Sequence, residues 1–176
     1  MTAAPETITR IHLLQEAATS LAAEAVHSAD GRETGGILLG ALRPDGVAEV
    51  HYAGGPGPVA VRTPDFFLRD LRHAQRLADQ EFTRSGNVWI GDWHTHPHGN
   101  PAPSARDVAT YAKLLSDQEL GFKAFLALIL CPGRLGWDQP HIAGWAYQQG
   151  QATPVPISVF GRVHAHKPKT SPKETT

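Results

Sequence analysis

Apolar residues recur at helical spacing in three stretches of the chain. Between Leu13 and Val26, leucines and alanines come in pairs four residues apart, which predicts an amphipathic helix. Thr63-Pro64-Asp65 offers a capping residue followed by a proline, so a second helix is expected to begin there and to bury a stripe that includes Phe67 and Phe82. A third helix is expected over residues 104–115.

Shorter apolar runs between these helices predict β-strands. The expected strands cover residues 8–12, 34–42, 47–53, 87–93, 123–131, 139–148 and 155–159. Arg43-Pro44-Asp45-Gly46 has the composition of a turn and predicts a hairpin, whereas proline and glycine predict loops at 54–58 and 96–103. This order of elements predicts an α/β (α+β) fold in which helices flank a mixed β-sheet.

Length and composition agree with one globular domain. A chain of 176 residues with 41 % hydrophobic residues is long enough to bury a single core and too short for two domains of ordinary size. Residues 161–176 have few groups that could join a core, so we expect a disordered tail there. The domain is therefore assigned to residues 1–160.

Charge and cysteine content narrow the expected partners and compartment. The formal net charge is −1, so no basic surplus points to nucleic acid or to a membrane surface. The longest apolar run, Ala124 to Cys131, is far shorter than the roughly 20 residues that span a bilayer, and the N-terminus lacks the apolar core of a secretory signal. Cys131 is the only cysteine, which excludes an internal disulfide and favours a cytoplasmic location. The oligomeric state is left open.

Three residues have the spacing and chemistry of metal ligands. His94 and His96 come at the end of an expected strand, where alternation puts both imidazoles on one face, about 7 Å apart along the strand. Asp107 falls in the first turn of the helix that follows the loop, so its carboxylate can return to the same point. Two imidazoles and one carboxylate leave the fourth position of a tetrahedral zinc site open, which is the pattern of a catalytic site.

Each part of this pattern also has a purely structural interpretation. Ser104 and Asp107 alone fit a capping box, in which their side chains bind free amides of the first helical turn. A lone His-x-His pair, such as His164 and His166 in the tail, is usually just two exposed histidines. It is the combination of His94, His96, Ser104 and Asp107 at this spacing that favours a metal site.

The sequence resembles the JAMM metalloprotease family at both halves of that family's motif. The MPN domain of the family carries His-x-His-Pro, six further residues, then Ser-x-x-Asp, together with an upstream glutamate; here these match His94 to Asp107 and the segment Glu33 to Gly40. The similarity covers roughly residues 13–148. It implies a deaminase-like MPN fold with one catalytic zinc.

The resemblance also implies a role for each matched residue. His94, His96 and Asp107 would be the zinc ligands, Glu33 the general base and Ser104 the residue that stabilises the oxyanion. These roles agree with the chemistry, because zinc activates water and polarises a carbonyl, while a carboxylate can carry the proton to the leaving amine.

Four further residues are candidates for supporting the site or touching the substrate. Asp92 shares the face of His94 by alternation and could orient a metal ligand or the attacking water. His98 lies in the loop beside the expected metal. Gly35 and Gly36 would let an extended substrate pair with their strand, although close strand packing could also require glycine there.

The implied activity is that of a zinc isopeptidase that removes a ubiquitin-like protein by cutting after its C-terminal glycine. Gly-acid-Trp-His-Thr-His-Pro resembles a bacterial branch of the family found in antiphage operons, although Asp92 stands where glutamate is expected. A peptidase that processes a sulfur-carrier protein, and a non-catalytic MPN scaffold, are the alternatives. Two other classes of metal enzyme are excluded. A zinc nucleoside deaminase needs a Pro-Cys-x-x-Cys pair, whereas this chain has one cysteine. A metal-dependent TIM barrel needs about 250 residues, whereas this chain has 176.

Overall fold

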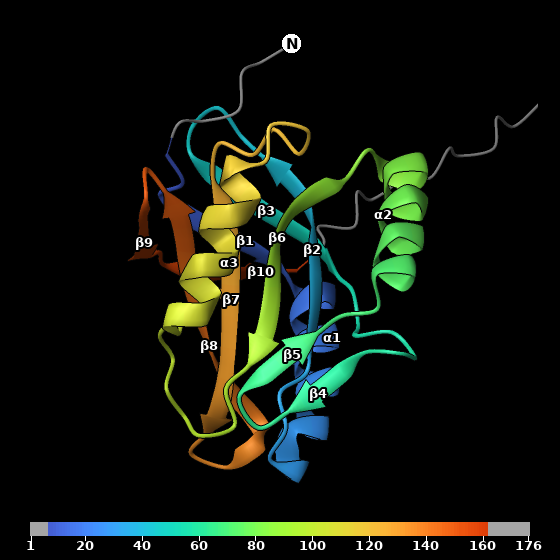
Figure 1. Cartoon of the computed structure of the whole chain (residues 1–176), viewed down its shortest axis with the longest axis vertical. Coiled ribbons are helices and arrows are strands. Elements are labelled where there is room, and N and C mark those ends of the chain that lie inside the picture. The colour runs from blue at the N-terminus through green and yellow to red at the C-terminus, as the bar shows by residue number, and fades with distance from the viewer. Residues whose placement is uncertain (1–6, 162–176) are drawn as a thin grey trace, which may run out of the picture.

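The structure is a computed structural model that describes residues 7–161 (Figure 1). Its helices are α1 (Gln15–Ala25), the short 3-10 helix η1 (Val26–Asp30), α2 (Leu71–Ser85) and α3 (Ala105–Ser116). Its strands are β1 (Arg10–Leu14), β2 (Gly35–Leu42), β3 (Val47–Ala53), β4 (Val61–Thr63), β5 (Phe66–Leu68), β6 (Val88–Thr95), β7 (Phe125–Gly133), β8 (Gly136–Gln148), β9 (Gln151–Pro154) and β10 (Ile157–Phe160).

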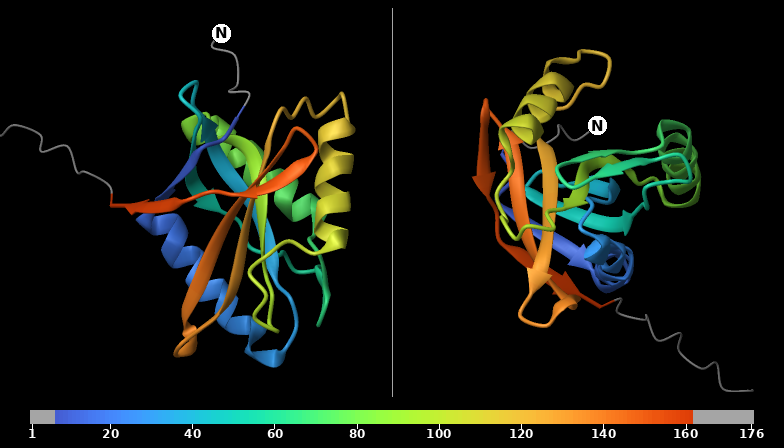
Figure 2. Two further views of the ribbon diagram at one scale, coloured as in Figure 1. Left: turned by 90° about the vertical axis from the view of Figure 1, so that its left-hand side faces the viewer. Right: turned by 60° about the horizontal axis from the view of Figure 1, so that its bottom comes forward.

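Eight of the strands form one mixed sheet in the order β10-β1-β3-β2-β6-β7-β8-β9, and β4 pairs with β5 in a separate hairpin. β1 runs parallel to β10 and β3, and β6 runs parallel to β7, whereas the other pairs are antiparallel. Residues 151–160 form one continuous segment that supplies both edge strands, β9 and β10. Between these strands, the Val155 amide donates to the Gly144 carbonyl (2.8 Å) and the Pro156 carbonyl accepts from the Ile11 amide (2.9 Å), so the segment crosses from one edge of the sheet to the other. The sheet is therefore strongly curled, as Figure 2 shows.

Helices cover both faces of the sheet (Figure 2). α1 packs through Ala17 and Leu21 into the main core, which also receives the side chains of Leu126 and Leu128 from β7. α2 and α3 cover the opposite face, where Tyr111 of α3 packs with Phe125 of β7 and Tyr147 of β8. Alternate residues of β7 thus point to opposite faces, as expected for a strand that is buried on both sides.

A β-bulge interrupts β6 just before the predicted metal ligands. Leu38 of β2 pairs with Gly91, but the next residue, Leu39, pairs with Trp89, so Ile90 has no partner on β2. A bulge of this kind changes which face the side chains on either side of it occupy. As a result Trp89 and Asp92 lie on the same face, and Trp89 Nε1 donates a hydrogen bond to Asp92 Oδ1 (3.0 Å).

The predicted fold class and most of the predicted elements are confirmed. The prediction that the second helix begins at Thr63 was wrong. Residues 63–68 belong to the β4–β5 hairpin, and α2 begins only after Asp70, whose carboxylate accepts hydrogen bonds from the backbone amides of Arg72 and His73. The buried face of α2 contains Ala74 and Glu81, two helical turns apart, whereas Phe82 is 62 % exposed, so the predicted burial of Phe82 was also wrong. The Asp70 side chain therefore caps α2, whereas Thr63 is the last residue of β4 and does not begin a helix.

Two other predictions concern the ends of the chain and membrane association. The predicted tail, apart from Gly161, lies outside the described residues, as do His164 and His166. Within residues 7–161, no helix is long and apolar enough to cross a membrane.

The fold predicts that Gly36 cannot accept a side chain. A Cβ atom at this buried position would collide with the carbonyl of Gly54, which is backbone and cannot swing away. We therefore expect Gly36→Ala to lower the free energy of unfolding by about 1–3 kcal/mol. Gly55→Ala is the matched control, because its Cβ would meet open space; it should change stability by less than about 0.5 kcal/mol. Urea unfolding of both variants measures this, and equal stabilities would contradict the packing described.

Candidate metal centre

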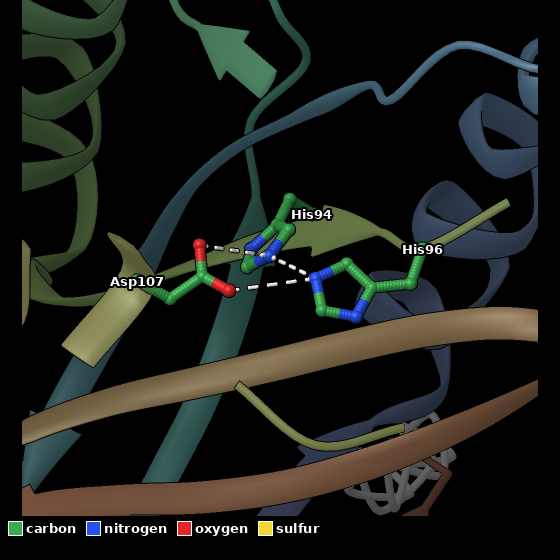
Figure 3. Close-up of side chains that lie close together, drawn as sticks. All are labelled: His94, His96 and Asp107. Atoms are coloured by element: carbon green, nitrogen blue, oxygen red, sulfur yellow. Dashed lines mark hydrogen bonds and ion pairs between the residues drawn. The ribbon is translucent and has the colours of Figure 1, made fainter. Parts of the chain in front are cut away.

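β6 and α3 bring the three predicted ligands together (Figure 3). His94 and His96 project from the end of β6, and Asp107 reaches them from the first turn of α3. The two Nε2 atoms lie 2.9 Å apart, and Asp107 places Oδ1 3.4 Å from His94 Nε2 and Oδ2 3.5 Å from His96 Nε2. All three side chains are largely shielded from solvent.

A backbone carbonyl fixes the orientation of His96. Its Nδ1 lies 2.6 Å from the carbonyl oxygen of Asn100, which can only accept, so the ring nitrogen must donate. In a neutral imidazole this leaves the Nε2 lone pair free to face His94 and Asp107. Burial lowers the pKa of His96, but the hydrogen bonds to Asp107 and Asn100 outweigh burial and raise it overall. The same contact to a carbonyl is typical of metal-binding histidines.

Asp107 serves the helix and the histidine pair at once. Its Oδ2 accepts a hydrogen bond from the Ser104 amide (2.7 Å), while Ser104 Oγ accepts one from the Asp107 amide (3.1 Å). The predicted capping box is therefore present and does not compete with a metal-binding role. Although burial raises the pKa of Asp107, its hydrogen bonds with His94 and His96 hold the pKa well below the usual range, so the carboxylate is ionised.

This donor set fits a zinc ion. Donor atoms that surround zinc tetrahedrally at about 2.0–2.1 Å stand roughly 3.3 Å apart, close to the separations among the three side chains here. The ligand atoms of His94, His96 and Asp107 all lie within 4.8 Å of one another, and no other such group occurs among residues 7–161. Two imidazoles and an ionised carboxylate also match the donors of catalytic zinc sites.

Glu33 lies at the same cavity, which has a volume of about 170 Å³ and is also lined by His94 and Asp107. The residue stands two positions before β2. It is 8 % exposed, and burial raises the pKa of its carboxyl group. A carboxylate with a raised pKa is better matched to proton transfer near neutral pH than an exposed one.

Asp92 also lines the cavity, on the face of His94, as alternation predicted. Its carboxylate is held by two neighbours: Oδ2 pairs with Arg69 Nη1, and Oδ1 accepts from Trp89 Nε1. The Arg69 guanidinium in turn lies over the Trp89 ring at 5.2 Å. The structure thus places Asp92 in an ion pair beside the cluster, and it is not one of the three grouped donors.

The remaining candidates are not among the three grouped donors. Ser104 caps α3 at an exposed position, and His98 is exposed in the loop. Gly35 and Gly36 are buried in β2, an inner strand between β3 and β6, where Cβ atoms would collide with backbone. Gly35 and Gly36 pair with His94 and Trp93 of β6, whereas pairing with β3 begins only at Leu38. Close packing thus accounts for both glycines, and pairing of a substrate with this strand stays a prediction.

Sequence reasoning missed the residue between the two histidines. Thr95 is fully buried and points away from the cluster, where its Oγ1 accepts a hydrogen bond from the Thr34 amide (2.9 Å) and bonds the Ser28 hydroxyl (2.6 Å). The Thr95 amide donates to the Thr34 carbonyl (2.9 Å). Thr95 therefore ties the segment that carries Glu33 to the strand that carries the histidines. Its small polar side chain within His-Thr-His was the sequence clue.

A family comparison agrees with the motif and with the geometry. The family described as prokaryotic homologs of the JAB domain matches residues 14–146, which is most of the chain and contains Glu33, both histidines and Asp107. The chain belongs to this prokaryotic JAB family. The predicted resemblance to JAMM (MPN-domain) proteins is thereby confirmed.

Curated relatives in bacteria share part of this domain. The chain is 33 % identical over 81 residues to a CD-NTase/cGAS isopeptidase of Escherichia coli, covering 45 % of this chain and 51 % of that protein. It is 31 % identical over 91 residues to a protein of the same name from Vibrio cholerae, covering 50 % of this chain and 58 % of that protein. The chain thus spans about half the length of these relatives.

A solved structure shares the fold. Protein DSY2949 of Desulfitobacterium hafniense superposes with a TM-score of 0.65 at 21 % identity, covering 89 % of this chain and 97 % of that one. At this identity the similarity concerns architecture alone.

The metal centre generates a prediction about metal content. The purified protein should hold about one zinc ion per chain, and His94→Ala or Asp107→Ala should lose it, because a site with three protein ligands rarely survives the loss of one. His98→Ala is the matched control, since this exposed histidine is outside the cluster. Elemental analysis after dialysis measures the metal content. Full retention in both ligand variants would contradict the assignment.

Proposed function

We propose that the chain is a zinc-dependent isopeptidase that releases a ubiquitin-like protein by cutting after its C-terminal glycine. The observation that carries the proposal is the convergence of His94, His96 and Asp107 beside a cavity that also contains Glu33. Membership of the JAB family and the isopeptidase name of the bacterial relatives support it. A non-catalytic scaffold would have no need of a complete donor set.

A zinc ion held by His94, His96 and Asp107 would supply Lewis acidity to the attacking water and to the scissile carbonyl. Glu33 takes a proton from the attacking water while the oxygen of that water forms a bond to the carbonyl carbon. When the carbon–nitrogen bond breaks, Glu33 gives that proton to the departing amine, which leaves as the free lysine side chain or N-terminus. The carboxylate thus returns to its starting state in each cycle.

In the proposed mechanism, Ser104 stabilises the oxyanion of the tetrahedral intermediate, which is the role that the family motif implies. Its Oγ already accepts the Asp107 amide in the capping box, so the hydroxyl hydrogen is the part that remains for donation. Removal of a donor to an oxyanion typically costs about 2.7–4 kcal/mol in transition-state binding.

The substrate is the C-terminal tail of a ubiquitin-like protein, in the proposed activity. The cavity is small and its walls include Phe66 and Phe67 of the hairpin, which leaves room for an extended backbone with small side chains. The curated relatives are named for a CD-NTase/cGAS target, and we extend that class of conjugate to this chain. Antiphage defence is then the expected setting, in preference to sulfur-carrier processing.

Replacing the general base tests the chemistry. Glu33→Gln should retain zinc and fold but lower single-turnover cleavage of a modifier fusion by at least about 100-fold, because an amide cannot accept the proton of the water. Glu49→Gln on β3 is the matched control and should cleave at the wild-type rate, since Glu49 pairs with Arg43 and His51 away from the cavity. A normal rate in Glu33→Gln would remove this residue from the mechanism.

Changing the end of the modifier tests specificity. A fusion that ends in glycine should be cleaved, and replacing that glycine by valine or leucine should lower kcat/KM by about tenfold to 100-fold, or roughly 1.4–2.7 kcal/mol. The physical reason is the narrow space between the hairpin and the cluster. Equal kcat/KM for fusions ending in glycine and leucine would indicate a general peptidase.

A further inference from the structure

The backbone of Glu33, the residue proposed as general base, is hydrogen-bonded to the β4–β5 hairpin. The Glu33 amide donates to the Thr63 carbonyl (2.8 Å), and the Glu33 carbonyl accepts from Arg62 Nε (2.9 Å). Both polar groups of the Glu33 main chain therefore bond to two consecutive residues of β4. The Glu33 side chain is left to face the cavity.

Arg62 directs its whole guanidinium group at the segment that carries Glu33. Its Nη1 donates to Asp30 Oδ2 (3.0 Å), and its Nη2 lies 3.2 Å from each of three acceptors, which are Asp30 Oδ1 and the carbonyls of His27 and Arg32. Together with the bond to the Glu33 carbonyl, these contacts span residues 27–33. A planar fork with five N–H donors suits this arrangement, and an ammonium group cannot reproduce it.

Thr34 is anchored from the other side. Thr95 receives the Thr34 amide and donates its own amide to the Thr34 carbonyl. The dipeptide Glu33-Thr34 is thus suspended between the hairpin and the strand that carries the metal ligands. With Thr34 fixed on β6, Arg62 and Thr63 set how far the Glu33 carboxylate reaches toward His94 and Asp107.

We infer that Arg62 is a positioning residue that holds Glu33 in its catalytic geometry. This inference rests on the proposed function. Arg62 is not among the residues that line the cavity, so its effect on turnover passes through the Glu33 backbone rather than through contact with substrate. A displacement of about 1 Å at a reacting group can cost 100-fold in rate, which makes such an anchor consequential.

Two variants of Arg62 test this role in the zinc-loaded protein. Arg62→Ala and Arg62→Lys should both lower the steady-state kcat by at least about tenfold, with KM within twofold and zinc content unchanged. The physical reason is that both variants lose the forked guanidinium group. Arg62→Lys keeps the charge and the long stem if Arg62→Ala folds poorly. Arg43→Ala is the matched control: Arg43 also pairs with two carboxylates, Asp45 and Glu49, and should leave kcat unchanged. A raised KM at constant kcat would overturn the inference and make Arg62 a substrate contact.

A double-mutant comparison separates positioning from a general structural effect. Glu33→Ala keeps the backbone groups that Arg62 binds, so adding Arg62→Ala to it should change the residual rate by less than twofold. Additive losses would overturn the inference. Wild-type turnover in Glu33→Ala would instead overturn the proposed function, and that result is independent of what the Arg62 variants do.

Amide hydrogen exchange provides a readout that needs no turnover. In the metal-free protein, Arg62→Ala should speed exchange of the Glu33 amide at least tenfold, because its partner strand is no longer fastened to residues 27–33. Amides of β7 should exchange at the wild-type rate. Unchanged exchange at Glu33 would show that Thr63 holds this residue without Arg62 and would contradict the inference.

Discussion

The alternation of side chains along His94-Thr95-His96 is the constraint on which the site depends. Because successive residues of a strand point to opposite faces, the two imidazoles share one face and Thr95 occupies the other. The imidazoles meet Asp107, while Thr95 bonds the main chain of Thr34, next to Glu33. One strand end therefore fixes both the proposed metal ligands and the proposed base. A shift of one residue in the pairing of β6 would separate them.

The surrounding architecture keeps this strand end in place. β6 is an inner strand between β2 and β7, so its register is set from both sides. The capping box then brings α3 to the cluster, because Asp107 binds the Ser104 amide and the histidines with the same carboxylate. The Asp107 carboxylate therefore has two roles, because it caps the start of α3 and completes the set of donor atoms.

Much of this was predictable from the sequence because it depends on local spacing. The two histidines on one strand face and the acidic residue in the first turn of a capped helix follow from period and capping rules alone. The competition between Asp70 and Thr63 as helix caps was decided by the hairpin of residues 61–68, a tertiary feature with three-residue strands that periodicity does not reveal. The burial of Gly35 and Gly36 likewise depended on strand order, which places β2 inside the sheet.

The contacts of Arg62 and Thr95 lay beyond prediction for a related reason. Arg62 joins segments about 30 residues apart and Thr95 joins segments about 60 residues apart, through hydrogen bonds that no local pattern encodes. Asp92 shows an intermediate case, since alternation gave its face correctly, whereas its pairing with Arg69 depends on the bulge at Ile90 and on the path of the chain before α2.

Zinc titration of the metal-free protein tests the central claim most directly, that the cluster of His94, His96 and Asp107 is a catalytic metal centre. The rate of single-turnover cleavage of a glycine-ended modifier fusion would be followed as zinc is added. The account predicts no cleavage at the start, a linear rise, and a plateau at about one zinc ion per chain. Full activity in the metal-free protein, or no activity at any zinc concentration, would contradict it.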